Sequence, residues 1–168
     1  MTSAGLLADA FGRVQEVVHE AVEGLTAEQL ATRLDAEANS IAWLCWHLTR
    51  VQDDHVAGAF GVPQVWTDYA KQFELPFGPA DIGYGHSSAQ VAQVTVASAG
   101  LLTGYQDAVH DQTIALVSGI TDTDLTRVVD KNWDPPVTMS VRLVSVISDC
   151  LQHAGQATFI RGILLRAS

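Results

Sequence analysis

The chain has 168 residues, 48% of them hydrophobic and 17% charged, which is the composition of one globular domain over residues 1–168. Its 19 acidic and nine basic residues give a formal net charge of -10, which disfavours nucleic acid and anionic lipid as partners. No apolar run approaches the ~20 residues that span a bilayer, and the N-terminal segment lacks the basic start of a secretory signal. Cys45 and Cys150 are too few for a disulfide scaffold, so we expect a cytoplasmic protein without a membrane anchor.

Four stretches carry apolar residues at the three- and four-residue spacing of amphipathic helices. They cover about residues 3–23, 40–59, 88–117 and 140–165. A serine at the start of each stretch offers an N-cap, namely Ser3, Ser40, Ser88 and Ser140. Sustained alternation of apolar and polar residues, which is typical of strands, is almost absent. The sequence therefore predicts an all-α fold, a four-helix bundle.

The two linkers that follow the first and third stretches resemble each other. Residues 24–35 recur in part as residues 119–130, and each copy contains the spacing of a capping pair, Thr26 with Gln29 and Thr121 with Asp124. We expect each pair to open a short extra helix. Two related halves explain the repeat, and chance recurrence of turn residues is the alternative.

Residues 61–87 carry several prolines and glycines and cannot form one continuous helix. This segment is long enough to run back along a helix of about 30 Å. We therefore expect a long crossover loop that makes the second and third helices parallel. The result is an up-down-down-up bundle in which the second and fourth helices are antiparallel.

Three polar residues interrupt apolar helix faces. His47 lies in the most apolar part of the second helix, and Asp149 and His153 share one face of the fourth at a spacing of four. A buried carboxylate costs several kcal/mol unless it is paired or binds a metal. His47, Asp149 and His153 thus predict a divalent-metal site whose remaining positions are open to water or substrate. In the alternative, Asp149 and His153 only hydrogen-bond to each other and His47 is a satisfied core histidine.

Residues 40–48, 83–87 and 149–156 resemble the DinB-like metalloprotein superfamily. This superfamily includes the bacillithiol and mycothiol S-transferases and the N-terminal domain of mycothiol-dependent maleylpyruvate isomerase, and the likeness extends over nearly the whole chain. Similar members bind a divalent ion through one histidine of the second helix and a His-x-x-x-His or Glu-x-x-x-His pair of the last. These positions correspond to His47, Asp149 and His153, and Asp149 departs from that pattern.

A divalent ion with two neutral imidazoles and one carboxylate keeps a net positive charge, so it attracts a thiolate and lowers the pKa of the thiol. Zn and Ni suit this ligand set best, and Fe and Mn are alternatives. The resemblance implies that the thiol is mycothiol and that the protein is a thiol S-transferase or isomerase acting on a small electrophile. A metal-dependent hydrolase and a non-catalytic metal-binding stress-response bundle remain open.

Several other polar residues lie near the expected site. Tyr84 and His86 end the crossover loop, and we predict that they line the site mouth as catalytic residues; the alternative is an ordinary loop position. Arg50 and Asp54 continue the His47 face, as contacts of the site or as a solvated salt bridge. Gln156 orients a ligand or packs.

The remaining histidines and the cysteines are expected to have no role in the site. Cys45 and Cys150 are predicted to be core residues. Acidic neighbours indicate solvated side chains for His19, His55 and His110. The high apolar content predicts a homodimer formed through an exposed stripe on the first or third helix.

Overall fold

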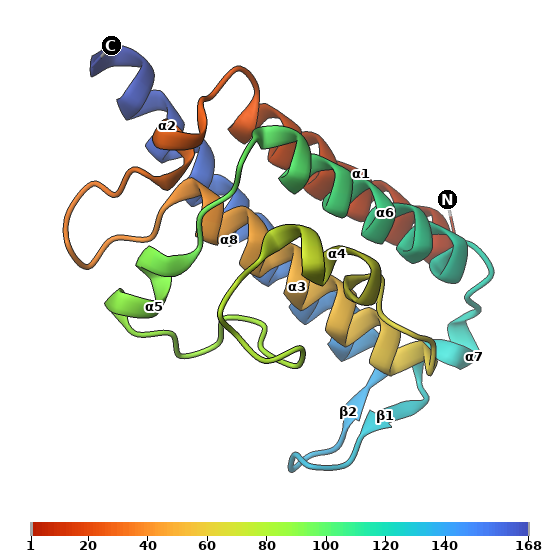
Figure 1. Ribbon diagram of the computed structural model, residues 1–168. Coiled ribbons are helices and arrows are strands. Elements are labelled where there is room, and N and C mark those ends of the chain that lie inside the picture. The colour runs from red at the N-terminus through yellow and green to blue at the C-terminus, as the bar shows by residue number, and fades with distance from the viewer. Residues whose placement is uncertain (1, 168) are drawn as a thin grey trace.

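A computed structural model describes residues 2–167 and confirms the all-α class. Four long helices dominate it: α1 (Ser3–Val22), α3 (Ile41–Phe60), α6 (Ala99–Val117) and α8 (Met139–Ala167) (Figure 1). Helix α1 packs against α6 and α8, and α3 packs against the same two helices. The α3–α8 pair is the most extensive of these contacts, so residues from early and late in the sequence lie side by side.

Hydroxyl side chains cap the starts of α1, α3 and α8, whereas Ser98 at the start of α6 forms no such hydrogen bond. Ser40 caps α3 as predicted, because its hydroxyl accepts the backbone N–H three residues on. At α1 the cap is Thr2 in place of Ser3. At α8 the hydroxyl of Thr138 plays this part in place of Ser140. In both corrected cases an equally capable hydroxyl stands one or two residues earlier.

The prediction of one continuous third helix over residues 88–117 is wrong, because the structure has two helices there. Helix α5 (Ser88–Gln93) is capped by Ser87, and α6 starts only at Ala99. The break contains the β-branched run Val94, Thr95 and Val96, in which both valines are buried. Residues two apart bury together in extended backbone, so core packing favours the break over a continuous helix.

The two linker helices confirm the predicted capping pairs. They are α2 (Ala27–Ala31) and α7 (Asp122–Leu125). Thr26 with Gln29 and Thr121 with Asp124 each form a reciprocal capping box. Helix α2 packs on α3 and α7 packs on α8, each on the long helix that follows it. The common origin of the two halves remains a prediction.

Two elements were not predicted. Within the crossover, α4 (Trp66–Phe73) buries Trp66 and Phe73 and packs against α6. A hairpin of β1 (Val128–Asp130) and β2 (Val137–Thr138) projects near the start of α8 (Figure 1). Its strands are too short to produce visible alternation in the sequence. Arg142 of α8 ties the hairpin down by an ion pair of 2.7 Å with Asp130.

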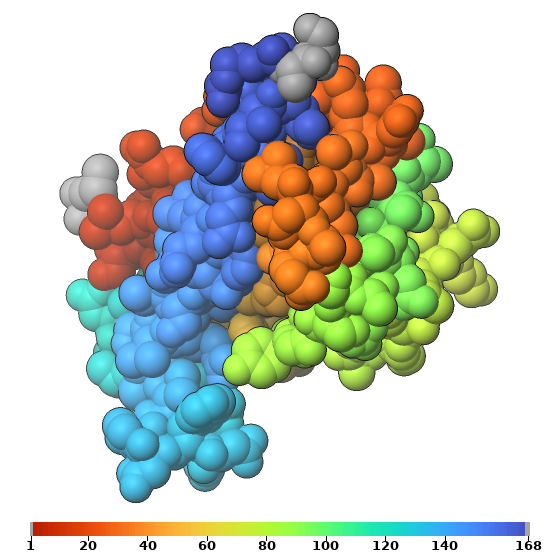
Figure 2. All heavy atoms as spheres, turned by 90° about the vertical axis from the view of Figure 1, so that its left-hand side faces the viewer, coloured from red at the N-terminus to blue at the C-terminus, as the bar shows by residue number. Residues whose placement is uncertain are grey.

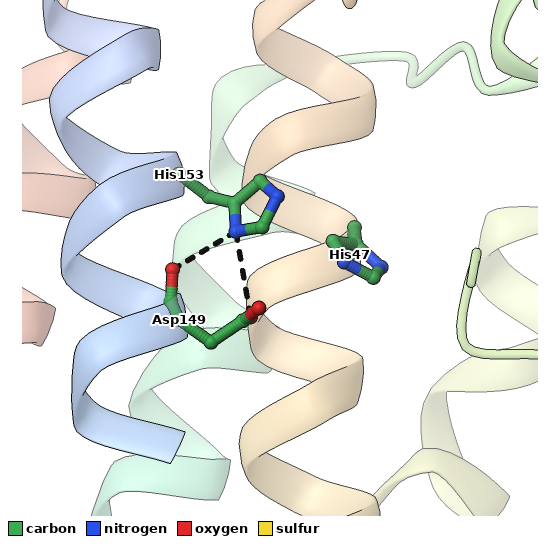
Figure 3. A group of neighbouring side chains, drawn as sticks. All are labelled: His47, Asp149 and His153. Carbon is green, nitrogen blue, oxygen red and sulfur yellow. Dashed lines mark hydrogen bonds and ion pairs between the residues drawn. The ribbon is translucent and has the colours of Figure 1, made fainter. Parts of the chain in front are cut away.

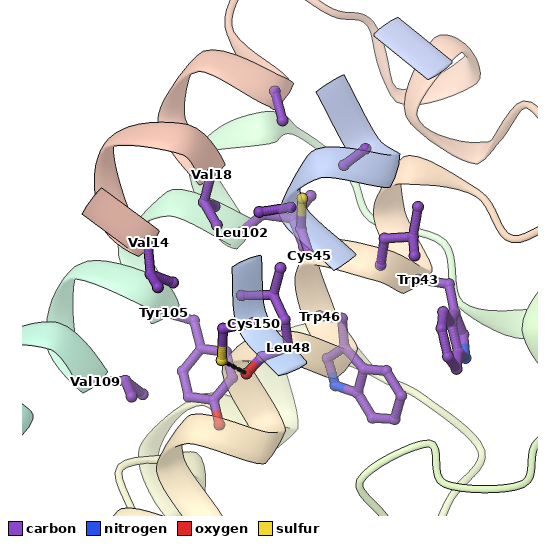
Figure 4. Packing of buried hydrophobic residues seen from close by; sticks show 14 of the residues in the cluster. Val14, Val18, Trp43, Cys45, Trp46, Leu48, Leu102, Tyr105, Val109 and Cys150 are labelled. Carbon is purple, nitrogen blue, oxygen red and sulfur yellow. Dashed lines mark hydrogen bonds between the residues drawn. The ribbon is translucent and has the colours of Figure 1, made fainter. Parts of the chain in front are cut away.

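The core confirms the predicted burial of both cysteines, which are free thiols (Figure 4). Burial raises the pKa of Cys45 to about 12, so this thiol stays protonated and inert. Among residues 2–167, no helix combines the length and apolarity needed to cross a membrane.

Exposed apolar side chains gather mainly on the last helix and not, as expected, on the first or third. Leu6 is exposed on α1. The exposed apolar side chains of α8 are Val141, Val144, Leu151, Phe159 and Leu165. The outer surface of α8 is thus the most apolar helix surface in the described part of the chain.

Candidate metal centre

The structure brings the three predicted ligands together between α3 and α8. His47 lies in the second turn of α3, and Asp149 and His153 lie one turn apart on α8 (Figure 3). Each offers one ligand atom, and these atoms all lie within 4.8 Å of one another. The three ligand atoms are thus close enough together for their side chains to share one ion.

Aromatic packing fixes the two imidazoles. The His47 side chain is buried, and its ring stacks on Trp43 with centroids 4.5 Å apart and an interplanar angle of 16°. The His153 ring meets the His47 ring edge-on at a centroid distance of 4.8 Å. Because stacking restricts ring rotation, both imidazoles are held in place before any ion binds.

A hydrogen bond selects the tautomer of His47. Its Nδ1 donates to the backbone oxygen of Ile82 in the crossover segment, which leaves Nε2 unprotonated and free to bind a metal. The next residue, Gly83, has φ +88° and lies so close that an added Cβ would stand 2.8 Å from His47 Nδ1. Only glycine allows the crossover backbone to approach this closely.

Arg50 holds the same crossover segment from inside the protein. Its side chain is fully buried and donates hydrogen bonds to the backbone oxygens of Pro79 and Asp81. It also forms an ion pair of 3.7 Å with Asp53 and lies 4.7 Å from the ring centroid of Trp66. The prediction of a solvated salt bridge is therefore wrong for Arg50. Its guanidinium group is buried because backbone oxygens of a segment distant in the sequence accept its hydrogen bonds.

One carboxylate oxygen in the cluster lacks a hydrogen bond. Asp149 Oδ2 is buried and accepts none. His153 Nδ1 lies 3.4 Å from this oxygen, and that nitrogen donates to the backbone oxygen of Asp149 at 2.9 Å. Buried carboxylate oxygens normally accept hydrogen bonds, and this one accepts none. A carboxylate oxygen and two imidazole nitrogens are common ligands of divalent metals, so the chemistry of the three residues fits a metal ion.

The electrostatics also favour a cation. Burial lowers the pKa of His47, which keeps this ring neutral near pH 7. Burial works to raise the pKa of Asp149, but His153 and His47 outweigh it, so the pKa falls below its usual value and the carboxylate is ionised. The same Asp149 side chain raises the pKa of His153. The cluster thus concentrates negative charge beside a neutral imidazole ligand.

Comparison with known proteins decides the family. Residues 6–165 match the family model described as Mycothiol-S-transferase. The chain belongs to the mycothiol S-transferase family. A solved structure, the conserved protein of a locus from Enterococcus faecalis, is 32% identical, covers 96% of each chain and has a TM-score of 0.87. No curated protein matches. The predicted DinB-like resemblance is confirmed.

Tyr84 and His86 occupy different places in this member of the mycothiol S-transferase family. Tyr84 is 90% exposed. His86 is nearly enclosed: Trp43 Nε1 donates to its Nδ1 at 3.2 Å, and its Nε2 donates to Asp81 at 3.0 Å. Tyr84 is therefore open to a ligand, whereas His86 ties the crossover segment to Trp43, on which the His47 ring stacks.

A cavity of about 640 Å³ opens between α3, the crossover segment, the hairpin and α8. In Figure 2 a hollow lies between the cyan hairpin, the blue α8 and the green crossover segment. The cavity is lined by Asp54, His55, Gly58, Ala59, Ile82, Tyr84, Val129, Asp130, Asn132, Trp133 and Arg142. It reaches Ile82, whose carbonyl oxygen accepts the hydrogen bond from His47, although none of the three ligand residues lines the cavity itself. Gln156 lines a separate cavity of about 460 Å³.

Sequence reasoning named Asp54 as a contact of the site but missed its partner His55, which lines this cavity with it from α3. His55 is half-buried, and its Nδ1 lies 3.1 Å from Asp54, so this histidine is only partly solvated. His110 is also not fully solvated, because its Nδ1 is buried without a hydrogen bond. His19 is exposed as predicted and pairs with Asp107. The adjacency of Asp54 and His55 in the sequence was the available signal, but adjacent helical residues seldom face each other.

Proposed function

We propose that this protein is a divalent-metal-dependent thiol S-transferase that joins a mycothiol-type thiol to a small electrophile. The observation that carries the proposal is the buried Asp149 Oδ2, which has no hydrogen bond and lies in a cluster with His47 and His153. Membership of the mycothiol S-transferase family supports the thiol as co-substrate. We propose that it acts in the cytoplasm.

His47, Asp149 and His153 would hold the ion, with Zn or Ni as first candidates and Fe or Mn as alternatives. When bound, a divalent ion supplies positive charge that lowers the pKa of a thiol. The protein residues do the remaining work: Ile82 keeps His47 Nε2 unprotonated, Trp43 fixes the ring plane, and the adjoining cavity takes the electrophile.

Tyr84 and His86 remain our proposed catalytic residues at the mouth of the site. The exposed ring of Tyr84 forms part of the cavity wall and can contact a substrate. For His86 the same role requires that its hydrogen bond to Trp43 or Asp81 opens. As it stands, His86 positions Trp43 and through it the ring of His47.

We further propose one domain, arranged as an up-down-down-up four-helix bundle that forms a homodimer. The contacts of α3 and α1 with both α6 and α8 support the bundle, as do the chain directions in Figure 1. The exposed apolar side chains of α8 support a dimer interface. Measurement of the mass in solution at micromolar concentration tests the dimer, and a monomer mass rejects it.

The decisive experiment combines metal analysis with turnover. The metal-loaded protein is incubated with mycothiol and either a chlorobimane-type halide or a maleylpyruvate-like cis diacid. We expect thiol-dependent turnover that is lost in Asp149→Ala and retained in Asp107→Ala, a control in the exposed pair with His19. Thiol-independent hydrolysis by the loaded protein would favour the hydrolase. Stoichiometric metal without any turnover would favour the non-catalytic metal-binding stress-response bundle.

A further inference from the structure

The cavity beside the ligand cluster contains an oriented histidine. His55 Nδ1 lies 3.1 Å from Asp54 Oδ2, and Asp54 Oδ1 accepts a hydrogen bond of 2.7 Å from Gln64. Gln64 in turn accepts a hydrogen bond of 2.9 Å from the buried Arg50. A fully buried guanidinium thus anchors the carboxylate that orients His55, which is more support than a surface ion pair has.

The other imidazoles of this region are already engaged. Nδ1 of His47 and Nδ1 of His153 both donate to backbone oxygens, and both residues belong to the proposed metal-ligand cluster. Both nitrogens of His86 are hydrogen-bonded. Within residues 2–167, Nε2 of His55 has no hydrogen-bond partner, and the residue lines the cavity. His55 is therefore the imidazole with a nitrogen available to a substrate.

The position of His55 suits the departing side of a displacement. It follows His47 by eight residues, about 12 Å along α3. A sulfur nucleophile at the cluster attacks its carbon in line, so the leaving atom departs on the side away from the cluster. The cavity extends from Ile82, next to His47, to His55 and Arg142, and so offers room for an electrophile along this direction.

We propose that His55 is a general acid that protonates the leaving oxygen of the electrophile, and that Asp54 positions it. This inference rests on the proposed transferase function. The substrate class is an electrophile whose leaving atom is a basic oxygen, such as an epoxide. The sulfur–carbon bond forms as the carbon–oxygen bond breaks, and the electron pair of the broken bond stays on oxygen. Asp54 holds the Nδ1–H of the His55 imidazolium, and oxygen takes the proton from its Nε2. The thiol proton passes to solvent, and solvent reprotonates Nε2 of His55.

The test compares two electrophiles in the metal-loaded protein with mycothiol: styrene oxide, whose oxygen needs a proton, and a chlorobimane-type halide, whose chloride does not. His55→Gln is expected to lower kcat on the epoxide by about 100-fold or more and kcat on the halide far less, with metal content close to that of wild type. His19→Gln, which removes an exposed histidine paired with Asp107, should change neither. Asp54→Asn should give a smaller loss, confined to the epoxide.

A second readout does not depend on turnover. Diethyl pyrocarbonate should modify His55 Nε2, as measured by mass spectrometry, and the thioether alcohol product should protect it. Equal losses of kcat on both electrophiles in His55→Gln would indicate a structural role and overturn the inference. The inference would also be overturned if the wild-type protein converted the halide but not the epoxide. Failure of wild type on both electrophiles would instead overturn the transferase function as well.

Discussion

Helix α3 buries polar side chains on two sides, and the two sides are satisfied differently. Toward α6, Thr49 donates a hydrogen bond to Gln106, Gln106 donates to Gln52, and Gln52 donates to Thr113, at 2.7, 3.3 and 3.0 Å. All four side chains are buried. The amide and hydroxyl groups of these four side chains form hydrogen bonds with one another, so they need no ligand.

Toward α8, the buried polar groups do not satisfy one another. Asp149 Oδ2 has no hydrogen bond, and His47 keeps Nε2 unprotonated because Nδ1 is held by Ile82. Burial of polar residues alone therefore does not mark a binding site in this protein. The two sides of α3 differ in how completely their polar groups are hydrogen-bonded to one another, and the variants below test each side separately.

The largest effect is expected from loss of a ligand on the α8 side. His47→Ala should lose bound metal, with affinity falling by more than the roughly 10- to 100-fold typical of changes in outer partners. Metal analysis by mass spectrometry after dialysis measures this. His19→Ala is the control, because His19 is exposed on α1. Retention of stoichiometric metal in His47→Ala would refute the site.

The crossover segment offers a sharper test on the same side. In Gly83→Ala the added Cβ would stand 2.8 Å from His47 and 2.9 Å from Trp46, so the ring of His47 must shift. We expect metal affinity to fall about 10- to 100-fold. Gly85→Ala is the matched control: it also has positive φ, at +73°, but its Cβ would contact nothing within 4 Å. Equal losses of metal affinity in the two variants would show that backbone strain, and not the contact with His47, causes the effect.

On the α6 side the expected effect is on stability alone. Thr49→Val keeps the side-chain shape but leaves the buried oxygen of Gln106 without its donor. This should cost about 1–3 kcal/mol in the free energy of unfolding, measured by urea denaturation. Metal content should equal that of wild type. A loss of metal would show that the two sides of α3 are coupled.

The smallest effect concerns pH in the metal-free protein. Burial lowers the pKa of His47 in the folded state, so below its unfolded value of about 6.5 the unfolded chain binds more protons. Stability from this residue is therefore complete above that pH and declines as the pH falls toward the folded pKa. Between about pH 7.5 and 5.5, wild type should lose more stability than His47→Gln. The raised pKa of His153 acts in the opposite direction but is common to both proteins.

The ligand cluster was predictable because its signals are local. Asp149 and His153 stand four apart on an apolar helix face, and His47 interrupts another, so helical geometry and the cost of burial single out these three residues. The choice between a metal site and ordinary hydrogen bonding also needed the DinB-like resemblance. The capping boxes of α2 and α7 likewise depend only on residues three apart. Such patterns are visible without knowledge of the tertiary contacts.

What the sequence did not reveal depends on distant contacts. The break at Val94 and Val96 arises because the core accepts both side chains. Arg50 resembled a surface cation, and its burial depends on carbonyl groups that the segment of Pro79 and Asp81 brings to it. The role of His55 became visible only with the cavity in place. Helix propensity and apolar periodicity are local properties of the sequence, so they do not predict contacts between distant segments.

The division of the ligand set between α3 and α8 has a consequence for assembly. His47 belongs to the early part of the chain, whereas Asp149 and His153 belong to its last helix. During synthesis the coordinating pocket is incomplete until α8 has left the ribosome and docked on α3. An ion that binds only the docked state stabilises it by mass action. A chain that lacks α8, or in which α8 has not docked on α3, lacks this stabilisation. Metal binding would therefore favour the correctly folded chains over the others.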